Sequence, residues 1–153
     1  MKRKISLLMV GVLAATMLTS CGNHAETTAF INEIDDFCTK IAEINTSINN
    51  INAEADSATL KLLGYLDNLN LEFQQFAQLD FPEEYDYLEN LADEAGEYMT
   101  EAVNSYKAAY SDGYDTDMGD YAKENYSRAY KRIQVIITFL NGDEPKDVTV
   151  TTE

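Results

Sequence analysis

The fold is decided by the stretch FINEIDDFCTKIAEINTSINNINAEA, residues 30–55, in which apolar side chains recur at alternating steps of four and three. A repeat of 3.5 residues is typical of helices that pack side by side at a shallow angle. The many isoleucines would suit a strand, but a strand needs a repeat of two. We therefore expect a long amphipathic helix from about Glu26 to Ala53 or Glu54. Its apolar positions are Phe30, Ile34, Phe37, Ile41, Ile44, Ile48, Ile51 and Ala55.

The same alternation returns further along the chain and predicts a second helix. Asp56 or Ser57 can cap its start. No Gly or Pro separates the two helices, so residues 53–58 leave open a tight hairpin or one continuous helix. A hairpin is favoured because a continuous helix would be a rod over ~70 Å long, with too little chain left to cover it. The apolar positions are Leu62, Leu66, Leu69, Phe73 and Phe76, with Leu63 and Leu79 beside them.

A third helix is predicted to begin in the segment Asp80-Phe81-Pro82-Glu83-Glu84. Proline is tolerated in the first turn of a helix, and acidic residues there interact favourably with the helix dipole. The helix should stop near Ser111, where Gly113 can take the left-handed conformation that ends helices. Its apolar positions are Tyr85, Leu88, Ala92, Ala95, Met99, Ala102, Tyr106 and Ala109.

A fourth helix is predicted after Asp115-Thr116-Asp117, which supplies an N-cap, and it closes at Gly142. Its apolar positions are Met118, Ala122, Asn125 or Tyr126, Ala129, Ile133, Ile136 and Leu140. Residues 143–153 hold no apolar cluster beyond Val148 and Val150, so we expect a disordered tail there. Four amphipathic helices with short joins predict an all-α fold, an antiparallel up-down four-helix bundle over residues 26–142.

Charge suggests how the last two helices align. The third helix carries eight acids and no base between Glu83 and Glu101, whereas the fourth holds Lys123, Arg128, Lys131 and Arg132. Folding the chain about Tyr114 sets residues 128–132 beside residues 96–100, where Glu97 and Glu101 lie near the basic stretch. Each exposed pair contributes only ~0–1 kcal/mol, so such pairs would set the register of the helices more than their stability.

The N-terminus carries a separate signal. Lys2, Arg3 and Lys4 precede an apolar run, residues 5–18, that is shorter than the ~20 residues needed to span a membrane. The block Leu18-Thr19-Ser20-Cys21 resembles the lipobox of bacterial lipoproteins. That resemblance implies removal of residues 1–20 as a signal peptide and a lipid, with fatty-acyl chains such as palmitate, on Cys21. Residues 21–25 would then be the lipidated N-terminus and linker, and the alternative is an ordinary signal peptide with a chance cysteine.

The resemblance also implies a location on the extracytoplasmic face of the cell membrane, and the net charge bears on partners there. Removing three basic residues leaves 8 lysines and arginines against 27 acidic residues, a formal charge near −19. Such a surface repels nucleic acid and anionic lipid headgroups. The lipid alone should therefore hold the protein to the membrane. Because about five residues reach at most ~18 Å, we expect a protein partner at or near the membrane.

The acidic segment at residues 112–120 resembles a calcium loop in composition, because it holds four carboxylates and two glycines. The spacing does not fit an EF-hand, which needs Gly at position 6 and Glu at position 12. A helix end, a turn and a new N-cap favour the same residue types. The segment therefore offers only weak candidates for a cation site, namely Asp112, Asp115, Asp117 and Asp120.

Catalytic chemistry has little support in the residue types present. The one histidine, His24, falls in the linker, and a nucleophilic triad or a di-iron centre needs histidines on the folded domain. Cys38 is expected to be a small buried hydrophobic residue. We therefore expect no enzyme and no cofactor. The leading expectation is a non-enzymatic module for protein interaction or scaffolding, and the alternative is a binding protein for a cation or small ligand.

Ten tyrosines and no tryptophan are the unusual feature of the composition. Tyrosine suits the boundary of a core, since its ring is apolar and its tip polar, and it is also enriched at protein interfaces. The interface interpretation places a patch of tyrosines and acids at the end of the bundle that carries the turn at residues 111–117. The tyrosines concerned are Tyr98, Tyr106, Tyr110, Tyr114, Tyr121, Tyr126 and Tyr130.

Overall fold

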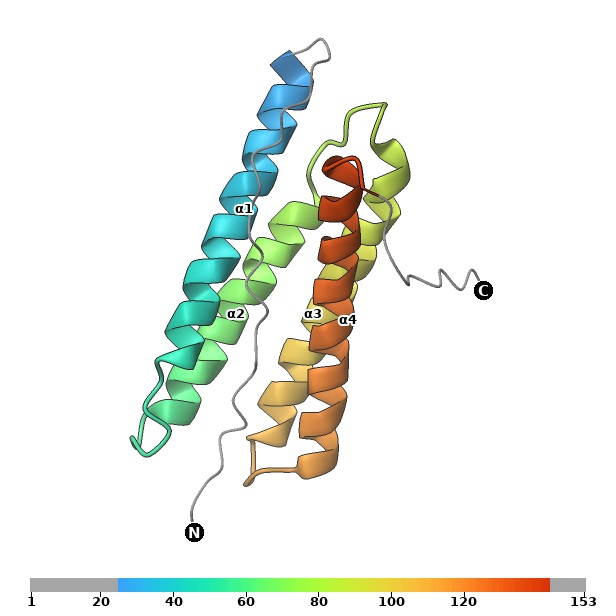
Figure 1. Cartoon of the computed structure of the whole chain (residues 1–153). Coiled ribbons are helices and arrows are strands. Elements are labelled where there is room, and N and C mark those ends of the chain that lie inside the picture. Colours follow the sequence, from blue (N-terminus) through green and yellow to red (C-terminus); the bar gives the residue numbers. More distant parts are fainter. Residues whose placement is uncertain (1–24, 144–153) are drawn as a thin grey trace.

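A computed structural model describes residues 25–143 and shows an all-α chain with no strand in that range (Figure 1). The expected all-α class is thereby confirmed for these residues. The elements are α1 (Ala25–Asn49), α2 (Ala58–Ala77), the short 3-10 helix η1 (Asp86–Leu88), α3 (Glu89–Ala109) and α4 (Thr116–Leu140). None of these helices is long and apolar enough to cross a membrane. The predicted signal peptide, Cys21, His24 and the tail from residue 144 lie outside the described residues.

The first two helices are separate, so the continuous helix is wrong and α1 also ends earlier than its apolar pattern suggested. The connection is a series of short turns, in which the amide of Ala55 donates to the carbonyl of Asn52 and that of Ala58 to Ala55. The Asn52 side chain also accepts from the amide of Glu54 at 3.1 Å. Asparagine side chains compete with helical hydrogen bonds in this way, which explains a break without Gly or Pro. Ser57 precedes α2 as predicted, but its hydroxyl makes no capping bond.

The third helix begins at Glu89, seven residues after the proline that was expected to open it. Pro82 instead starts a tight turn, in which its carbonyl accepts a hydrogen bond from the amide of Tyr85 at 2.7 Å. The rings of Phe81 and Tyr85 lie 4.8 and 5.9 Å from that of Phe30 at the start of α1. Burial of these rings against α1 therefore outweighs the local preference for a helix start.

The other helix ends agree with the sequence to within two residues. α3 ends at Ala109, and Gly113 has the expected positive φ of 105°. Asp115 caps α4, since its side chain accepts from the amides of Asp117 and Met118 at 3.0 and 3.1 Å. At the far end Gly142 has a φ of 75° and its amide donates to Phe139. These caps satisfy amides and carbonyls that a helix end leaves without partners.

The predicted apolar positions form one core to which all four helices contribute. Most of them are buried, although Ile44, Ile51, Ala55, Tyr85 and Met118 are only half-buried. Packed neighbours in space are α1 with α2, α2 with α3, and α3 with α4. The α1–α2 and α3–α4 connections lie at one end of the molecule, and the α2–α3 connection lies at the other end, beside the start of α1 (Figure 1).

Candidate functional site

A buried polar cluster joins α1 to α4 inside the core. The hydroxyl of Tyr126 donates to Oδ1 of Asn45 at 2.9 Å, and Nδ2 of Asn45 donates to the hydroxyl of Tyr130 at 2.7 Å. All three side chains are at most 9% exposed. A buried amide or hydroxyl without a partner costs about 1–3 kcal/mol, so these bonds hold α1 in one position against α4.

Burial also changes the acidity of this cluster. It raises the pKa of Tyr126 far above the ordinary value for tyrosine, and the neighbouring Tyr130 raises it further. Burial likewise raises the pKa of Tyr130, while its polar neighbours Tyr126 and Asn45 act in the opposite direction. Both phenols are therefore neutral at physiological pH, and they serve as fixed hydrogen-bonding groups and not as acids or bases.

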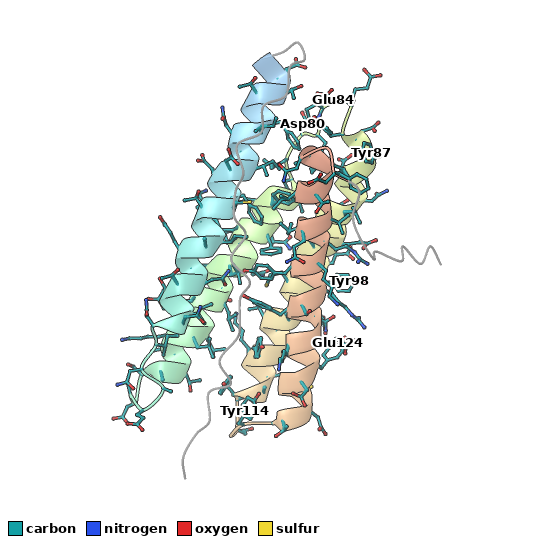
Figure 2. The ribbon with its side chains drawn as sticks, in the orientation of Figure 1. Asp80, Glu84, Tyr87, Tyr98, Tyr114 and Glu124 are labelled. Carbon is teal, nitrogen blue, oxygen red and sulfur yellow. The ribbon has the colours of Figure 1, made fainter. Side chains whose placement is uncertain are left out.

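A second group of tyrosines surrounds the α3–α4 connection. The rings of Tyr110 and Tyr114 lie 5.0 Å apart, and Tyr114 is 47% exposed. Its phenol end rests on Gly119, where a Cβ atom would lie 2.1 Å from the Tyr114 hydroxyl oxygen. Tyr121, one turn into α4, is 46% exposed. Tyr114 stands at the end of the bundle farthest from Asp80 and Glu84 (Figure 2).

The tyrosines thus divide between the two interpretations made from sequence. Tyr106, Tyr126 and Tyr130 are core residues, and burial raises the pKa of Tyr106 with smaller contributions from its neighbours Tyr114, Tyr110 and Asp120. Tyr114 and Tyr121 present substantial ring surface to solvent. The structure therefore leaves a smaller exposed patch than the sequence suggested, which we call the tip patch and define as Tyr114, Tyr121 and the acids at residues 112, 117 and 120.

The four candidate cation ligands lie on this connection and the first turn of α4, and all are exposed. Asp115 is engaged as the N-cap of α4. Among residues 25–143, no group of three acids, cysteines or histidines is arranged to hold a metal ion. Asp115 therefore serves the geometry of the turn, and Asp112, Asp117 and Asp120 contribute negative charge to the tip patch.

The predicted alignment of α3 with α4 is found around Tyr98. The guanidinium groups of Arg128 and Arg132 each lie 5.6 Å from the centre of the Tyr98 ring, a distance suited to a cation–π contact. Arg132 also pairs with Glu94. The basic stretch therefore lies beside residue 98 as expected, but its ionic partner on α3 is one turn before Glu97.

Cys38 is buried and free within the described part of the chain. Burial, together with the nearby charge of Asp35, raises the pKa of its thiol to about 11. A thiol in that state is a poor nucleophile, because the thiolate is the reactive form. The sequence interpretation of Cys38 as a small core residue is confirmed.

Sequence reasoning missed Asn45, which the apolar pattern treats as a polar spacer. The available signal was its spacing. Asn45 lies four residues after Ile41 and three before Ile48, which places it on the core-facing side of α1. The phenol groups that satisfy Asn45 are more than 80 residues away in the chain, so no local pattern announces the pairing. Comparison with protein-family models, with curated proteins and with solved structures found no match.

Proposed function

We propose that this chain is a lipoprotein held to the extracytoplasmic face of the cell membrane by the lipid on Cys21. Its helices form an antiparallel up-down bundle, and it acts without catalysis, as a protein-interaction or scaffold module. The surface that it offers to a partner is the tip patch. The argument rests on one observation, which is that the tip patch and the start of α1 lie at opposite ends of the bundle.

The position of α1 supports this orientation. Ala25, its first residue, follows Cys21 by four residues, and four residues reach at most about 14 Å. A lipid on Cys21 therefore keeps the start of α1 close to the bilayer. The 25 residues of α1 extend about 37 Å from there. The connection that carries Tyr114 is thus held several nanometres from the membrane.

The charges at the two ends agree with the same orientation. The end beside the start of α1 carries the exposed acids Glu26, Asp80, Glu83 and Glu84, which repel anionic headgroups. The sides of the bundle are acidic as well, with Glu33 and Glu43 on α1 and Asp93 and Glu101 on α3, so a bundle lying on the membrane would be repelled more strongly than an upright one. At the other end, exposed tyrosine rings stand among acids, a combination that suits a partner with a basic, partly apolar surface.

Cation binding, the alternative from the sequence, is less well supported. The Asp115 carboxylate is already occupied by two backbone amides. The remaining acids of the turn are exposed and separated by helical geometry, so no arrangement of three ligands is present in residues 25–143. We therefore propose the interaction function.

The anchoring is tested with two cysteine variants of the full precursor. Cys21→Ala should yield either unprocessed precursor or soluble protein, whereas Cys38→Ala should leave processing and membrane retention unchanged. Membrane fractionation and intact-mass spectrometry are the measurements. Retention of Cys21→Ala in the membrane at the mature mass would refute the lipid anchor.

The tip patch is tested by cross-linking in intact membranes, with mass spectrometry of the adducts. Tyr121→Ser should remove adducts to another protein. Tyr87→Ser is the matched control, because Tyr87 is equally accessible but lies at the opposite end (Figure 2). Adducts that persist in Tyr121→Ser, or that vanish equally in both variants, would exclude the tip patch as the binding surface.

A further inference from the structure

One outward-facing row of side chains on α2 has no role in the fold described so far. Leu60 is 76% exposed and Leu71 is 55% exposed, although both are large hydrophobic residues. They belong to a row of exposed positions spaced three or four apart, so they share one face of the helix. We call this row the outer stripe of α2 and define it as Leu60, Gly64, Asn68, Leu71, Gln75 and Gln78.

The six residues of the outer stripe are uncharged, although the chain has a formal charge of −16, and the exposed charged residues of α2 that flank them are Lys61 and Asp67. The exposed faces of α1 and α3 are acidic, with Glu33, Asp36 and Glu43 on the first and Asp93, Glu97 and Glu101 on the second. α4 carries exposed charges of both signs. The outer stripe is therefore the face on which the negative surface of the protein is interrupted.

The acids beside the outer stripe are neutralised within the chain. α2 contains two acidic residues, Asp67 and Glu72. Asp67 lies 2.5 Å from the ammonium group of Lys107 on α3, and Glu72 lies 3.3 Å from that of Lys40 on α1. These pairs contribute little to stability at an exposed site, but they reduce the negative potential that an approaching surface would meet.

Gly64 lies in the middle of the outer stripe and is not explained by the packing of this chain. A Cβ atom added there would meet nothing within 4 Å. A glycine inside a helix costs roughly 0.5–1 kcal/mol relative to alanine. Gly96, in contrast, packs closely against α2, since its Cβ would lie 3.1 Å from the Gln74 amide nitrogen, nearer than an ordinary van der Waals contact. Gly64 leaves room for a backbone that comes from outside the chain.

We propose that the outer stripe of α2 is a two-fold contact with a second copy of this chain. Two molecules of such high negative charge repel each other through their acidic faces, and the outer stripe is where that repulsion is least. A two-fold contact also uses the same patch on both molecules, which an uncharged stripe of Leu, Gly, Asn and Gln permits without any charge complementarity.

The orientation of the two copies rests on the lipid anchor proposed above. If both copies stand upright on one membrane, the two-fold axis lies along the membrane normal and the two α2 helices run parallel. Each stripe residue then faces its own counterpart, Leu60 with Leu60 and Leu71 with Leu71. Asn68 also faces Asn68, where the two side-chain amides can donate and accept hydrogen bonds between the copies.

The contact is small, which determines where it would form. The 20 residues of α2 extend about 30 Å. One stripe along this length offers less area than a standard interface, which buries about 800 Å² per partner. The pair should therefore be weak for molecules free in solution. Confinement to the same membrane raises the effective concentration of one copy around the other, so the pair should form there.

The test uses disulfide trapping of the full chain in membranes. Asn68→Cys places a thiol next to the two-fold axis, and Asn104→Cys, on the exposed face of α3, is the matched control. Cys38 stays in both variants because it is buried. Mild oxidation should convert Asn68→Cys to a species of twice the mature mass several-fold more than Asn104→Cys. Adding Leu71→Glu to Asn68→Cys should reduce that species several-fold.

Two results would overturn the proposal. One is equal trapping of the two cysteine variants, or no trapping of either, and the other is an adduct whose mass shows a different protein on Asn68→Cys. Fractionation of the same samples reports the lipid anchor separately. A protein found in the membrane that fails to trap excludes the dimer alone, whereas a soluble protein that traps excludes the anchor and supports the contact between copies.

Discussion

The contact between α3 and α4 and the contacts of α1 with the other helices use the same four-three pattern of core positions. The side chains at those positions differ in size. Between α3 and α4 the fully buried positions are mostly alanines, which bring the two backbones close together. Around α1 the positions are filled by large rings, with Phe37 lying 5.4 Å from Phe73 and 4.3 Å from Phe76. These alanines are Ala92, Ala95, Ala102, Ala109, Ala122 and Ala129.

The difference shows that side-chain volume, and not the pattern, sets the distance between helices. Close packing leaves no room for an added methylene, while a wide gap must be filled by long side chains. We call the space between α1 and its neighbours the wide region and the contact between α3 and α4 the close region. The Asn45 cluster lies in the wide region, where tyrosines on α4 are long enough to reach an amide on α1. We therefore expect the wide region to be sensitive to lost volume and the close region to added volume.

The largest expected effect is a loss of volume in the wide region. Phe73→Ala should lower the free energy of unfolding by about 3–5 kcal/mol, because Phe73 is fully buried between Phe37 and Tyr130. Urea denaturation followed by circular dichroism measures it. Tyr87→Ala is the control, since the Tyr87 ring is exposed and makes a T-shaped contact with Phe139, so this variant should lose less than about 1.5 kcal/mol. Equal losses would contradict the assignment of Phe73 to the core.

An added volume should be harmful in the close region. Ala129→Leu should destabilise the protein by about 1–3 kcal/mol, because Ala129 is fully buried between α4 and α3. Ala108→Leu adds the same atoms at an exposed position of α3 and should leave stability almost unchanged. Thermal unfolding of both variants is the measurement. If Ala129→Leu and Ala108→Leu unfold at the same temperature, α3 and α4 are not closely packed.

Removal of the amide that links the two regions should have an effect of similar or smaller size. Asn45→Ala leaves the buried hydroxyl of Tyr126 without its acceptor, which should cost about 1–3 kcal/mol. Tyr126→Phe added to Asn45→Ala removes that hydroxyl as well, so the double variant should lose less than the sum of the single changes. Strict additivity in a double-mutant cycle would show that the bond does not couple α1 to α4.

The buried thiol and phenols should make the free energy of unfolding fall at alkaline pH, with no effect at neutral pH. The folded protein raises the pKa of Cys38 from 9.0 to about 11 and raises those of Tyr126 and Tyr130 from 10.0. The unfolded chain therefore loses these protons first, and the free energy of unfolding falls as the pH rises above about 9. Urea midpoints between neutral and alkaline pH measure the fall. In Cys38→Ala the fall should begin at higher pH, and an unchanged onset would exclude the thiol as its source.

The candidate site was predictable in part. The acids and tyrosines near residue 114 were located from composition and turn signals, because caps and turns are encoded by adjacent residues. Which tyrosines stay exposed was not predictable, since Tyr121 and Tyr126 differ only in the side of α4 on which they lie relative to α1. The sequence pattern left Leu60 and Leu71 outside the core positions of the second helix, but only the packing of the other helices shows that no part of the described chain covers them.

The sequence by itself determined that residues 25–143 are all-helical, where α4 is capped, and which apolar positions form the core, because these depend on neighbours within a turn or two. It also supplied the lipobox resemblance at Cys21. Only the tertiary structure decided that Pro82 opens a turn and not a helix, since packing of Phe81 and Tyr85 on Phe30 stabilises the fold more than an earlier helix start would. It likewise decided the partners of Asn45 and the exposure of Leu60, because burial of a given side chain depends on helices that are distant in the sequence.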